Sequence, residues 1–203
     1  MAKQLTYAIE PGGPKRVTID SRPMWQNCQI FFDGTLVGTI PNYTALMAGL
    51  DFPLPDGSIL RVLYTNKFLI GQFHVLRNGK PLPGSESDPN VQMRNAFLVT
   101  YAVGVYDIVV GLLVGLFNVK FLATMGVTIW SSLIGAIFLL LAYLTSRGSK
   151  LALILAIALF LFDTLVSVYL GHSLGVDFLI RLVVLIPMAL GLGGIKASKK
   201  QEN

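Results

Sequence analysis

Four charged residues interrupt the apolar C-terminal half of this chain, and their chemistry stands out. Asp107, Asp163 and Asp177 are carboxylates and Arg181 is a guanidinium, and each lies inside a long hydrophobic run. A charge at the centre of a membrane-spanning helix costs at least about 2.5–3.5 kcal/mol, so such residues need partners. We therefore predict a polar network inside a helical bundle, formed by Asp107, Asp163, Ser167, Asp177 and Arg181.

The spacing around His172 supports this network. Asp163 and Arg181 each lie nine residues from His172, and Ser167 and Asp177 each lie five residues from it. Residues equally far from the turn of an antiparallel helical hairpin have similar depth, which brings an acid level with a base. Two interpretations remain open: a protonatable acid in a proton relay, and a structural Arg–Asp pair that clamps two helices.

Four apolar runs predict the helices that position these residues, at 97–117, 121–145, 151–170 and 174–195. Each run is close to the roughly 20 residues that cross a hydrocarbon core. The connections are three to five residues long, so neighbouring helices should be antiparallel. Small residues at helical spacing, such as Gly104, Gly111 and Gly115, predict close helix contacts. Pro187 is expected to bend the fourth helix because it lacks an N–H group.

Basic residues gather on one side of this predicted bundle, and only Lys120 falls on the other side. They are Arg94, Arg147, Lys150, Lys196, Lys199 and Lys200. Because positive residues favour the cytoplasmic side, both termini are predicted to be cytoplasmic. The N-terminus also lacks the apolar core of a secretory signal peptide.

Residues 1–84 predict a soluble, cytoplasmic β domain of the antiparallel sandwich or barrel type. Three turn signals recur at about 22-residue spacing. They are Asp33-Gly34, Asp56-Gly57 and Asn78-Gly79. A short helix is expected from Asn42 to Gly49, and Asp88-Pro89 predicts a helix start within the linker 85–96. The predicted fold class is thus a membrane four-helix bundle, 97–203, preceded by a small all-β domain.

Catalytic, cofactor and metal-binding patterns are missing from the sequence, so we predict no enzyme and no cofactor. His74 has no second ligand at metal-binding spacing, and the glycines match no phosphate-binding loop. Cys28 is the only cysteine, which excludes an internal disulfide and makes a disulfide-linked partner unexpected. The net charge of +5 comes from scattered bases, which does not indicate nucleic-acid binding.

Several segments resemble a group of multi-pass membrane proteins of cyanobacteria and other bacteria that have an N-terminal cytoplasmic β domain. They are Phe32-Asp33-Gly34, 37–40, 54–58, 75–85, Arg181 with 185–188, and Ile195-Lys196. The resemblance brings no established activity and no catalytic residues. It implies a plasma or thylakoid membrane, and photosynthetic complexes among the partners.

The leading functional hypothesis is a non-enzymatic membrane accessory or assembly factor. Its β domain would dock a partner, and its bundle would pack in lipid beside a larger membrane complex. The alternative is a small proton- or ion-coupled transporter or channel that uses the Asp/Arg cluster. A membrane enzyme built on Asp107 and Asp163 is a third, weaker hypothesis, since neither residue lies in a known motif.

Overall fold

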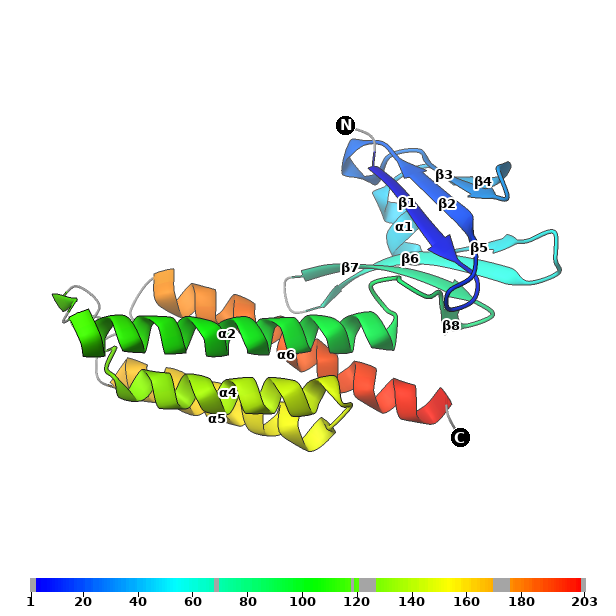
Figure 1. Cartoon of the computed structure of the whole chain (residues 1–203). Coiled ribbons are helices and arrows are strands. Elements are labelled where there is room, and N and C mark those ends of the chain that lie inside the picture. The colour runs from blue at the N-terminus through cyan, green and yellow to red at the C-terminus, as the bar shows by residue number, and fades with distance from the viewer. Residues whose placement is uncertain (1–2, 68–69, 118, 121–126, 170–175, 202–203) are drawn as a thin grey trace. The chain divides into compact units, whose positions relative to one another are not determined.

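The chain divides into two units, Met1–Val91 and Gln92–Asn203 (Figure 1). The computed structural model describes residues 3–67, 70–117, 119–120, 127–169 and 176–201. The first unit is antiparallel β structure and the second is helical, with four long helices among the described residues. This order of a β region followed by helices confirms the predicted arrangement of secondary structure.

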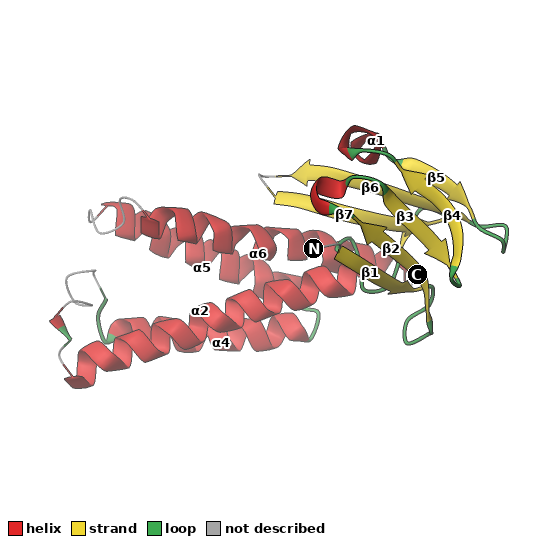
Figure 2. Ribbon diagram, turned by 90° about the horizontal axis from the view of Figure 1, so that it is seen from above, coloured by secondary structure: helices red, strands yellow, loops and turns green. Residues whose placement is uncertain are grey.

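Within the part of the chain that the structure describes, eight strands form two four-stranded antiparallel sheets, each with its strands in chain order. The first sheet contains β1 (Lys3–Ala8), β2 (Lys15–Ser21), β3 (Cys28–Phe32) and β4 (Thr35–Ile40). The second contains β5 (Leu50–Pro53), β6 (Ile59–Lys67), β7 (Ile70–Arg77) and β8 (Lys80–Pro81). A 3-10 turn, η1 (Pro23–Trp25), and a short helix, α1 (Tyr43–Ala48), lie between strands. Figure 2 shows the first sheet lying over the second.

Two of the three predicted turns have the backbone geometry that a tight hairpin requires. Asp33 and Gly34 both have positive φ, at 50° and 81°, and so do Asn78 and Gly79, at 49° and 79°. Two successive positive φ values define the type I′ turn, whose twist matches that of the flanking strands.

The third turn differs from the other two because Pro55 precedes Asp56. Proline fixes φ near about −65°, which suits the second position of a type I turn. The Gly57 N–H donates to the Leu54 carbonyl at 3.0 Å, and only Gly57 of the Asp56-Gly57 pair has positive φ, at 79°. The hairpin connection is therefore longer than the two-residue turn that the sequence suggested.

The longest hairpin was not predicted. β6 pairs with β7 from Leu60 opposite Arg77 to Lys67 opposite Ile70. The segment between these strands carries none of the Gly, Pro or Asn signals that mark tight turns. Residues 68 and 69 lie outside the described residues.

The two sheets share one apolar core. Val17, Ile19 and Ile30 of the first sheet are fully buried together with Leu60 and Val62 of the second. Their alternation along each strand follows the two-residue period of β structure. Burying this face from water is what favours folding of the unit.

Capping groups define both helix starts that the sequence predicted. The Asn42 side chain accepts a hydrogen bond from the Ala45 N–H at 2.9 Å, which begins α1. Asp88 accepts from the Asn90 N–H at 2.9 Å and from the Gly84 N–H at 2.7 Å. The helix α2 accordingly begins at the next residue, proline, and spans Pro89–Phe117.

The remaining long helices are α4 (Trp130–Ser146), α5 (Lys150–Tyr169) and α6 (Val176–Gln201). The predicted second helix, 121–145, is not helical at residues 127 and 128, and its predicted start lies outside the described residues, which omit 121–126. Val127, Thr128 and Ile129 are β-branched, which lowers helix propensity. The Thr128 N–H also donates to the Ser131 hydroxyl at 3.3 Å, so this N–H group is satisfied without a helical hydrogen bond.

The helix α6 extends six residues beyond its predicted end at Ile195, to Gln201. Pro187 lies inside it without ending it. Residue 174, the predicted start of this helix, lies outside the described residues.

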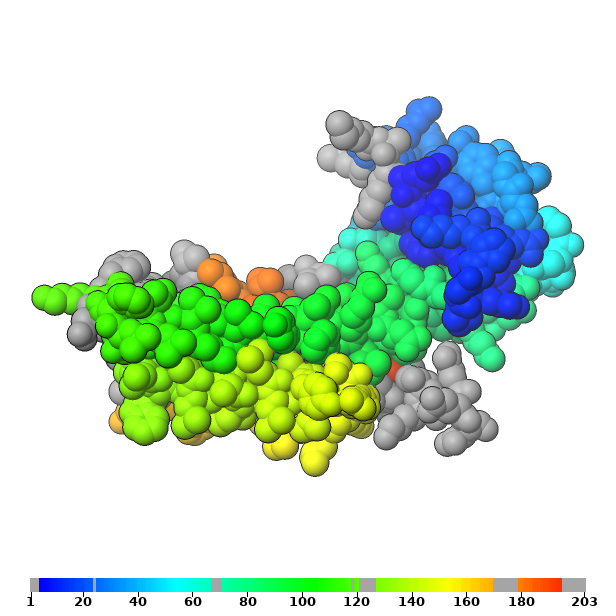
Figure 3. Space-filling model, viewed as in Figure 1, coloured from blue at the N-terminus to red at the C-terminus, as the bar shows by residue number. Residues whose placement is uncertain are grey.

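Glycines allow α2 and α4 to approach closely. A Cβ added at Gly135 would lie 2.6 Å from the Gly104 carbonyl oxygen, and one added at Gly111 would collide with the Ser132 Oγ. Figure 3 shows these two helices side by side along their length. The predicted small-residue stripe of the first helix therefore lies at a helix–helix contact.

Candidate functional site

An ion pair joins α5 and α6 in the helical unit. The Arg181 Nη1 donates to the Asp163 Oδ2 at 2.6 Å and to the Thr164 Oγ1 at 3.4 Å. The Arg181 side chain is 22% exposed and the Asp163 side chain 38% exposed within the chain. Charge-assisted hydrogen bonds of this length are among the stronger polar contacts in proteins.

The local structure of α5 holds the acceptors of this pair in place. Thr164 is buried, and its hydroxyl donates to the Phe160 carbonyl at 2.7 Å. That bond fixes the Thr164 oxygen so that its remaining lone pair faces the guanidinium. Asp163 and Thr164 thus present two adjacent oxygen acceptors to Arg181.

The other members of the predicted network lie in different settings. Asp107 is half-buried on α2, and the charges of Asp163 and Arg181 both act on it. Among the described residues, its carboxylate makes no hydrogen bond or ion pair. Ser167 is half-buried one turn after Asp163, and the Asp177 side chain lies outside the described side chains. The structure therefore brings Asp163 and Arg181 into contact. Asp107 lies close enough to interact with the charges of both residues.

The surface of the helical unit is strongly apolar. By length and composition, α2 and α5 are long and apolar enough to cross a membrane, whereas α4 and the Leu179–Gly194 part of α6 are apolar but shorter. In the most apolar 18-residue stretch of each long helix, only 22% is buried within the chain. Large side chains such as Leu116, Phe162 and Leu165 are 65–67% exposed.

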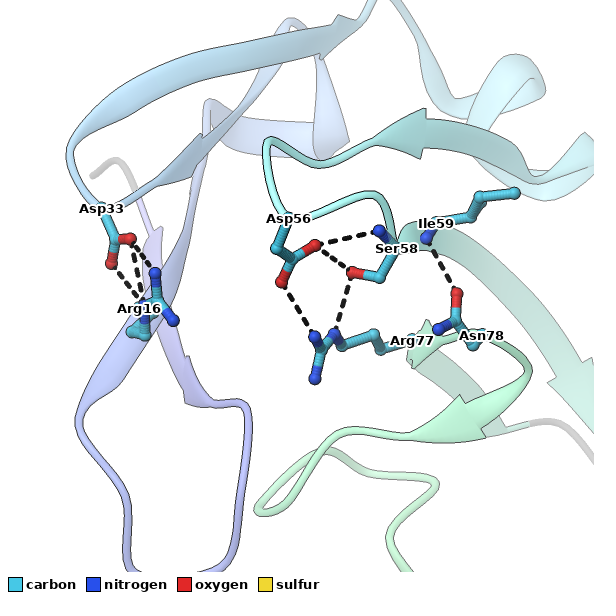
Figure 4. Close-up of polar contacts among 7 residues, drawn as sticks. All are labelled: Arg16, Asp33, Asp56, Ser58, Ile59, Arg77 and Asn78. Carbon is cyan, nitrogen blue, oxygen red and sulfur yellow. Dashed lines mark hydrogen bonds and ion pairs between the residues drawn. The ribbon is translucent and has the colours of Figure 1, made fainter.

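Two charge clusters lie at hairpin turns of the β unit (Figure 4). The Arg16 Nε donates to both carboxylate oxygens of Asp33, at 2.8 and 3.0 Å. The Arg77 Nη2 donates to the Asp56 Oδ2 at 2.8 Å, and its Nε donates to the Ser58 Oγ at 2.9 Å. These contacts hold the Asp33 turn against β2 and the Asp56 turn against β7.

Hydrogen bonds keep both carboxylates of these clusters ionised. The bonds from Arg16 hold the pKa of Asp33 below its usual value. The Ser58 hydroxyl and N–H, followed by the charge of Arg77, lower the pKa of Asp56. Because every charged group in these clusters has an opposite partner, the clusters indicate a structural role for the turns.

Aromatic side chains from four elements gather on another part of the β unit. Trp25 stacks on Phe73 with ring centroids 4.7 Å apart and contacts Tyr64 at 5.9 Å. Tyr43 meets Tyr64 edge-on at 5.4 Å. Trp25 and Tyr43 also line a surface pocket together with Gln26, Asn42 and Thr44. We call these five pocket-lining residues the aromatic pocket.

Sequence reasoning did not identify the aromatic pocket or the two turn clusters. The aromatic residues are far apart in the sequence, so only the pairing of β6 with β7 and the position of η1 bring them together. A local signal did exist for one cluster, since Pro55-Asp56-Gly57-Ser58 is a turn whose serine follows the acid by two residues.

The described residues contain no group of three or more His, Cys, Asp or Glu side chains that could hold a metal ion. The His74 Nε2 lies 2.7 Å from the Thr65 Oγ1, a hydrogen bond between neighbouring strands. Cys28 is buried and free, and burial raises the pKa of its thiol. A buried thiol with a raised pKa is a poor nucleophile.

No protein-family model, curated protein or solved structure matches this chain. The architecture of the chain is therefore described from its own structure. It combines a β unit of two four-stranded sheets with a helical unit whose described residues form four long apolar helices.

Proposed function

We propose that this chain is an integral membrane protein whose four helices cross the bilayer and whose β unit docks a partner protein on the cytoplasmic side. The apolar outer surface of the helices supports the membrane part of the proposal, because lipid is the solvent that such a surface fits. The uneven distribution of basic residues supports cytoplasmic termini. The membrane is a bacterial plasma membrane or a thylakoid.

The aromatic pocket is the observation that carries the docking role. Trp and Tyr are enriched at protein interfaces because each combines a large apolar surface with a polar group. Tyr43 is 36% exposed, and the neighbouring Met47 of α1 is 47% exposed. This non-enzymatic role is that of an accessory or assembly factor, which holds a partner beside a larger membrane complex. Photosynthetic complexes are one class of such partners.

Co-purification from the native membrane tests the docking role. We expect a defined protein to be retained in mild detergent by the unchanged chain and to be lost from Thr44→Arg, which places a long charged side chain in the aromatic pocket. Thr35→Arg is the matched control, because Thr35 is an exposed residue of β4 outside the pocket. Equal recovery of that protein with both variants, or its absence from the unchanged chain, contradicts docking at the pocket.

The contact between Asp163 and Arg181 favours a second candidate, a small proton- or ion-coupled transporter or channel. A carboxylate such as Asp107, close to a paired acid and base inside a bundle, is a group that a proton relay would use. The accessory role leads because four helices without internal repeats are few for a transporter that works as a monomer.

Flux into proteoliposomes distinguishes the two candidates. Transport predicts a proton or ion flux that falls at least tenfold in Asp107→Asn, with a smaller change in Ser167→Ala. A chain that carries no flux, or whose flux is unchanged in Asp107→Asn and Asp163→Asn, is inconsistent with this second candidate.

A further inference from the structure

The connection between α4 and α5 is a rigid turn that presents two basic residues. Gly148 has a positive φ of 78°, and its N–H donates to the Thr145 carbonyl at 2.9 Å. The Ser149 N–H donates to the Leu144 carbonyl at 3.1 Å. These two bonds form the Schellman motif, which fixes the path of the chain after a helix. Arg147 and Lys150 flank Gly148 and Ser149, so the motif fixes the positions of their backbones.

The side chain of Arg147 is held in an outward position. Its Nη2 donates to the Tyr143 hydroxyl at 2.8 Å, and its Cζ lies 5.2 Å from the centroid of the Tyr143 ring. Arg147, Tyr143 and Lys150 are all exposed. Among the described residues, the remaining N–H groups of this guanidinium meet no acceptor, so they are available to a ligand.

A third base lies at the same end of the helical unit. A Cβ added at Gly191 would collide with the Ala96 Cβ and would lie 3.1 Å from a Leu153 methyl group, so these three residues form one layer of α2, α5 and α6. Arg94 precedes Ala96 by two residues and Lys150 precedes Leu153 by three. Both bases therefore lie within about one helical turn of this layer.

The described bases at this end are Arg94, Arg147 and Lys150. The sequence of the last turns of α6 adds Lys196, Lys199 and Lys200. The exposed base nearest the opposite end of the helices is Lys120. A strongly positive end complements a surface of negative charge.

We propose that Arg147 and Lys150 bind the phosphate of an anionic phospholipid headgroup in the cytoplasmic leaflet, with Tyr143 positioning the guanidinium. Arginine offers paired N–H donors that match the geometry of phosphate oxygens, and lysine adds a point charge. Tyrosine is suited to the headgroup level of a bilayer. The basic residues at this end attract the net negative charge of the lipid. The inference rests on the proposed membrane placement.

Lipid titration of the full-length protein in nonionic detergent tests this site. Phosphatidylglycerol should raise the melting temperature of the unchanged chain clearly more than phosphatidylcholine does. In Arg147→Gln/Lys150→Gln, binding of phosphatidylglycerol should weaken about thirtyfold, the factor expected when two bases near a charged leaflet are lost. Lys120→Gln is the matched control, since it removes one exposed base from the other end and should leave the preference unchanged.

Two further variants separate a binding role from a folding role. Arg147→Lys should restore part of the preference, because it keeps the charge and loses the paired donors. Tyr143→Phe should cause a smaller loss than the double variant, because it removes only the hydroxyl that orients Arg147. Inorganic phosphate at equal concentration should not reproduce the effect of the lipid.

The proposed site is wrong if both lipids stabilise the unchanged chain equally, if the double variant keeps the preference, or if inorganic phosphate acts as well as the lipid. Failure of the membrane placement gives a different result, namely release of the chain from membranes by alkaline carbonate. A chain that resists carbonate but shows no lipid preference overturns only the headgroup site.

Discussion

The two units use the same pair of residue types, arginine and aspartate, in opposite surroundings. In the β unit, Arg16 pairs with Asp33 at an exposed turn, where the two side chains are 41% and 46% exposed. In the helical unit, Arg181 pairs with Asp163 between two apolar helices. Exposed pairs contribute little to stability because water and salt screen them. A pair in lipid has no such solvent, so the loss of one partner leaves an uncompensated charge.

The units also differ in what holds them together. The β unit buries an apolar core away from water, as soluble domains do. The helical unit turns large apolar side chains outward and places glycines at its helix contacts. In lipid, hydrophobicity does not drive helix association, so close packing and polar contacts do. Under the proposed membrane placement, one chain therefore depends on two different solvents, water for the β unit and lipid for the helical unit.

Removal of a large core side chain should have the largest effect on the β unit. Phe73 is 1% exposed, and Phe73→Ala should lower the free energy of unfolding by about 4 kcal/mol through lost burial and a cavity. Trp25 fluorescence in a Trp130→Phe background measures the unfolding of this unit alone, because the chain has two tryptophans. Leu36→Ala, at a position 51% exposed, is the control and should have little effect. Equal losses in the two variants would contradict a core that excludes water.

The Asp163–Arg181 pair should be the next most sensitive feature. Arg181→Ala should destabilise the helical unit by about 3 kcal/mol in detergent, because Asp163 loses its partner. Asp163→Leu/Arg181→Met removes both charges and should restore most of that loss. Thermal unfolding followed by Trp130 fluorescence in a Trp25→Phe background measures both effects.

The exposed counterpart in the β unit provides the comparison for Arg181. Arg16→Ala should change the Trp25 unfolding midpoint only slightly. If Arg181→Ala is as mild as Arg16→Ala, the helical pair lies in water and the contrast between the units disappears.

The helix contact between α2 and α4 should tolerate no added methyl group. In Gly135→Ala, the new Cβ would lie 2.6 Å from a backbone oxygen and 2.8 Å from the Ile108 backbone nitrogen, so the helices must move apart. We expect a loss of about 2 kcal/mol. Gly193→Ala is the matched control, because the nearest atom to its Cβ is the Gln92 Oε1 at 4.0 Å. A Gly193→Ala variant that is destabilised as much as Gly135→Ala would remove the packing explanation.

Acid should produce the smallest of these effects, and the β unit is where it can be measured. The pKa values of Asp33 and Asp56 are lower in the folded state than in the unfolded state. Their contribution is therefore complete above the unfolded pKa of about 3.9 and is lost as the pH falls through the folded values. The urea midpoint of Trp25 fluorescence should fall between pH 5 and pH 2.5, as roughly bracketed by that unfolded value. The double variant Arg16→Gln/Arg77→Gln should show a shallower decline of the urea midpoint. Parallel declines in the variant and the unchanged chain would contradict this prediction.

The sequence predicted those parts of the fold that local signals determine. Asp33-Gly34 and Asn78-Gly79 require positive φ, and Asn42 and Asp88 cap helices, so each was correctly placed from neighbouring residues. The start of α4 was missed because apolar composition alone continues through residues 127–129, where β-branched side chains and a serine hydroxyl disfavour the helix.

Contacts between distant residues were predictable only where a simple symmetry applied. Equal distance from His172 placed Asp163 level with Arg181, and the structure brings these two side chains into contact. The aromatic pocket has no such symmetry, because Trp25 and Tyr43 lie in two irregular connections and each contacts Tyr64 of a paired strand. The membrane setting of the pair and the role of Asp107 stay predictions.

Cysteine accessibility is the most direct test of a helical unit that lies in lipid. In a Cys28→Ala background, Leu155→Cys places a thiol at a position of α5 that is 50% exposed within the chain. Thr128→Cys and Ser146→Cys place thiols at exposed positions near opposite ends of α4. The probe is a charged maleimide that does not cross sealed membranes.

In spheroplasts, we predict labelling of Thr128→Cys from outside, labelling of Ser146→Cys only after permeabilisation, and no labelling of Leu155→Cys in either case. Position 155 is half-exposed within the chain, so its protection is the result expected for a helix that lies in the bilayer. Labelling of Leu155→Cys as fast as Ser146→Cys in permeabilised membranes would contradict it and leave α5 as a helix exposed to water.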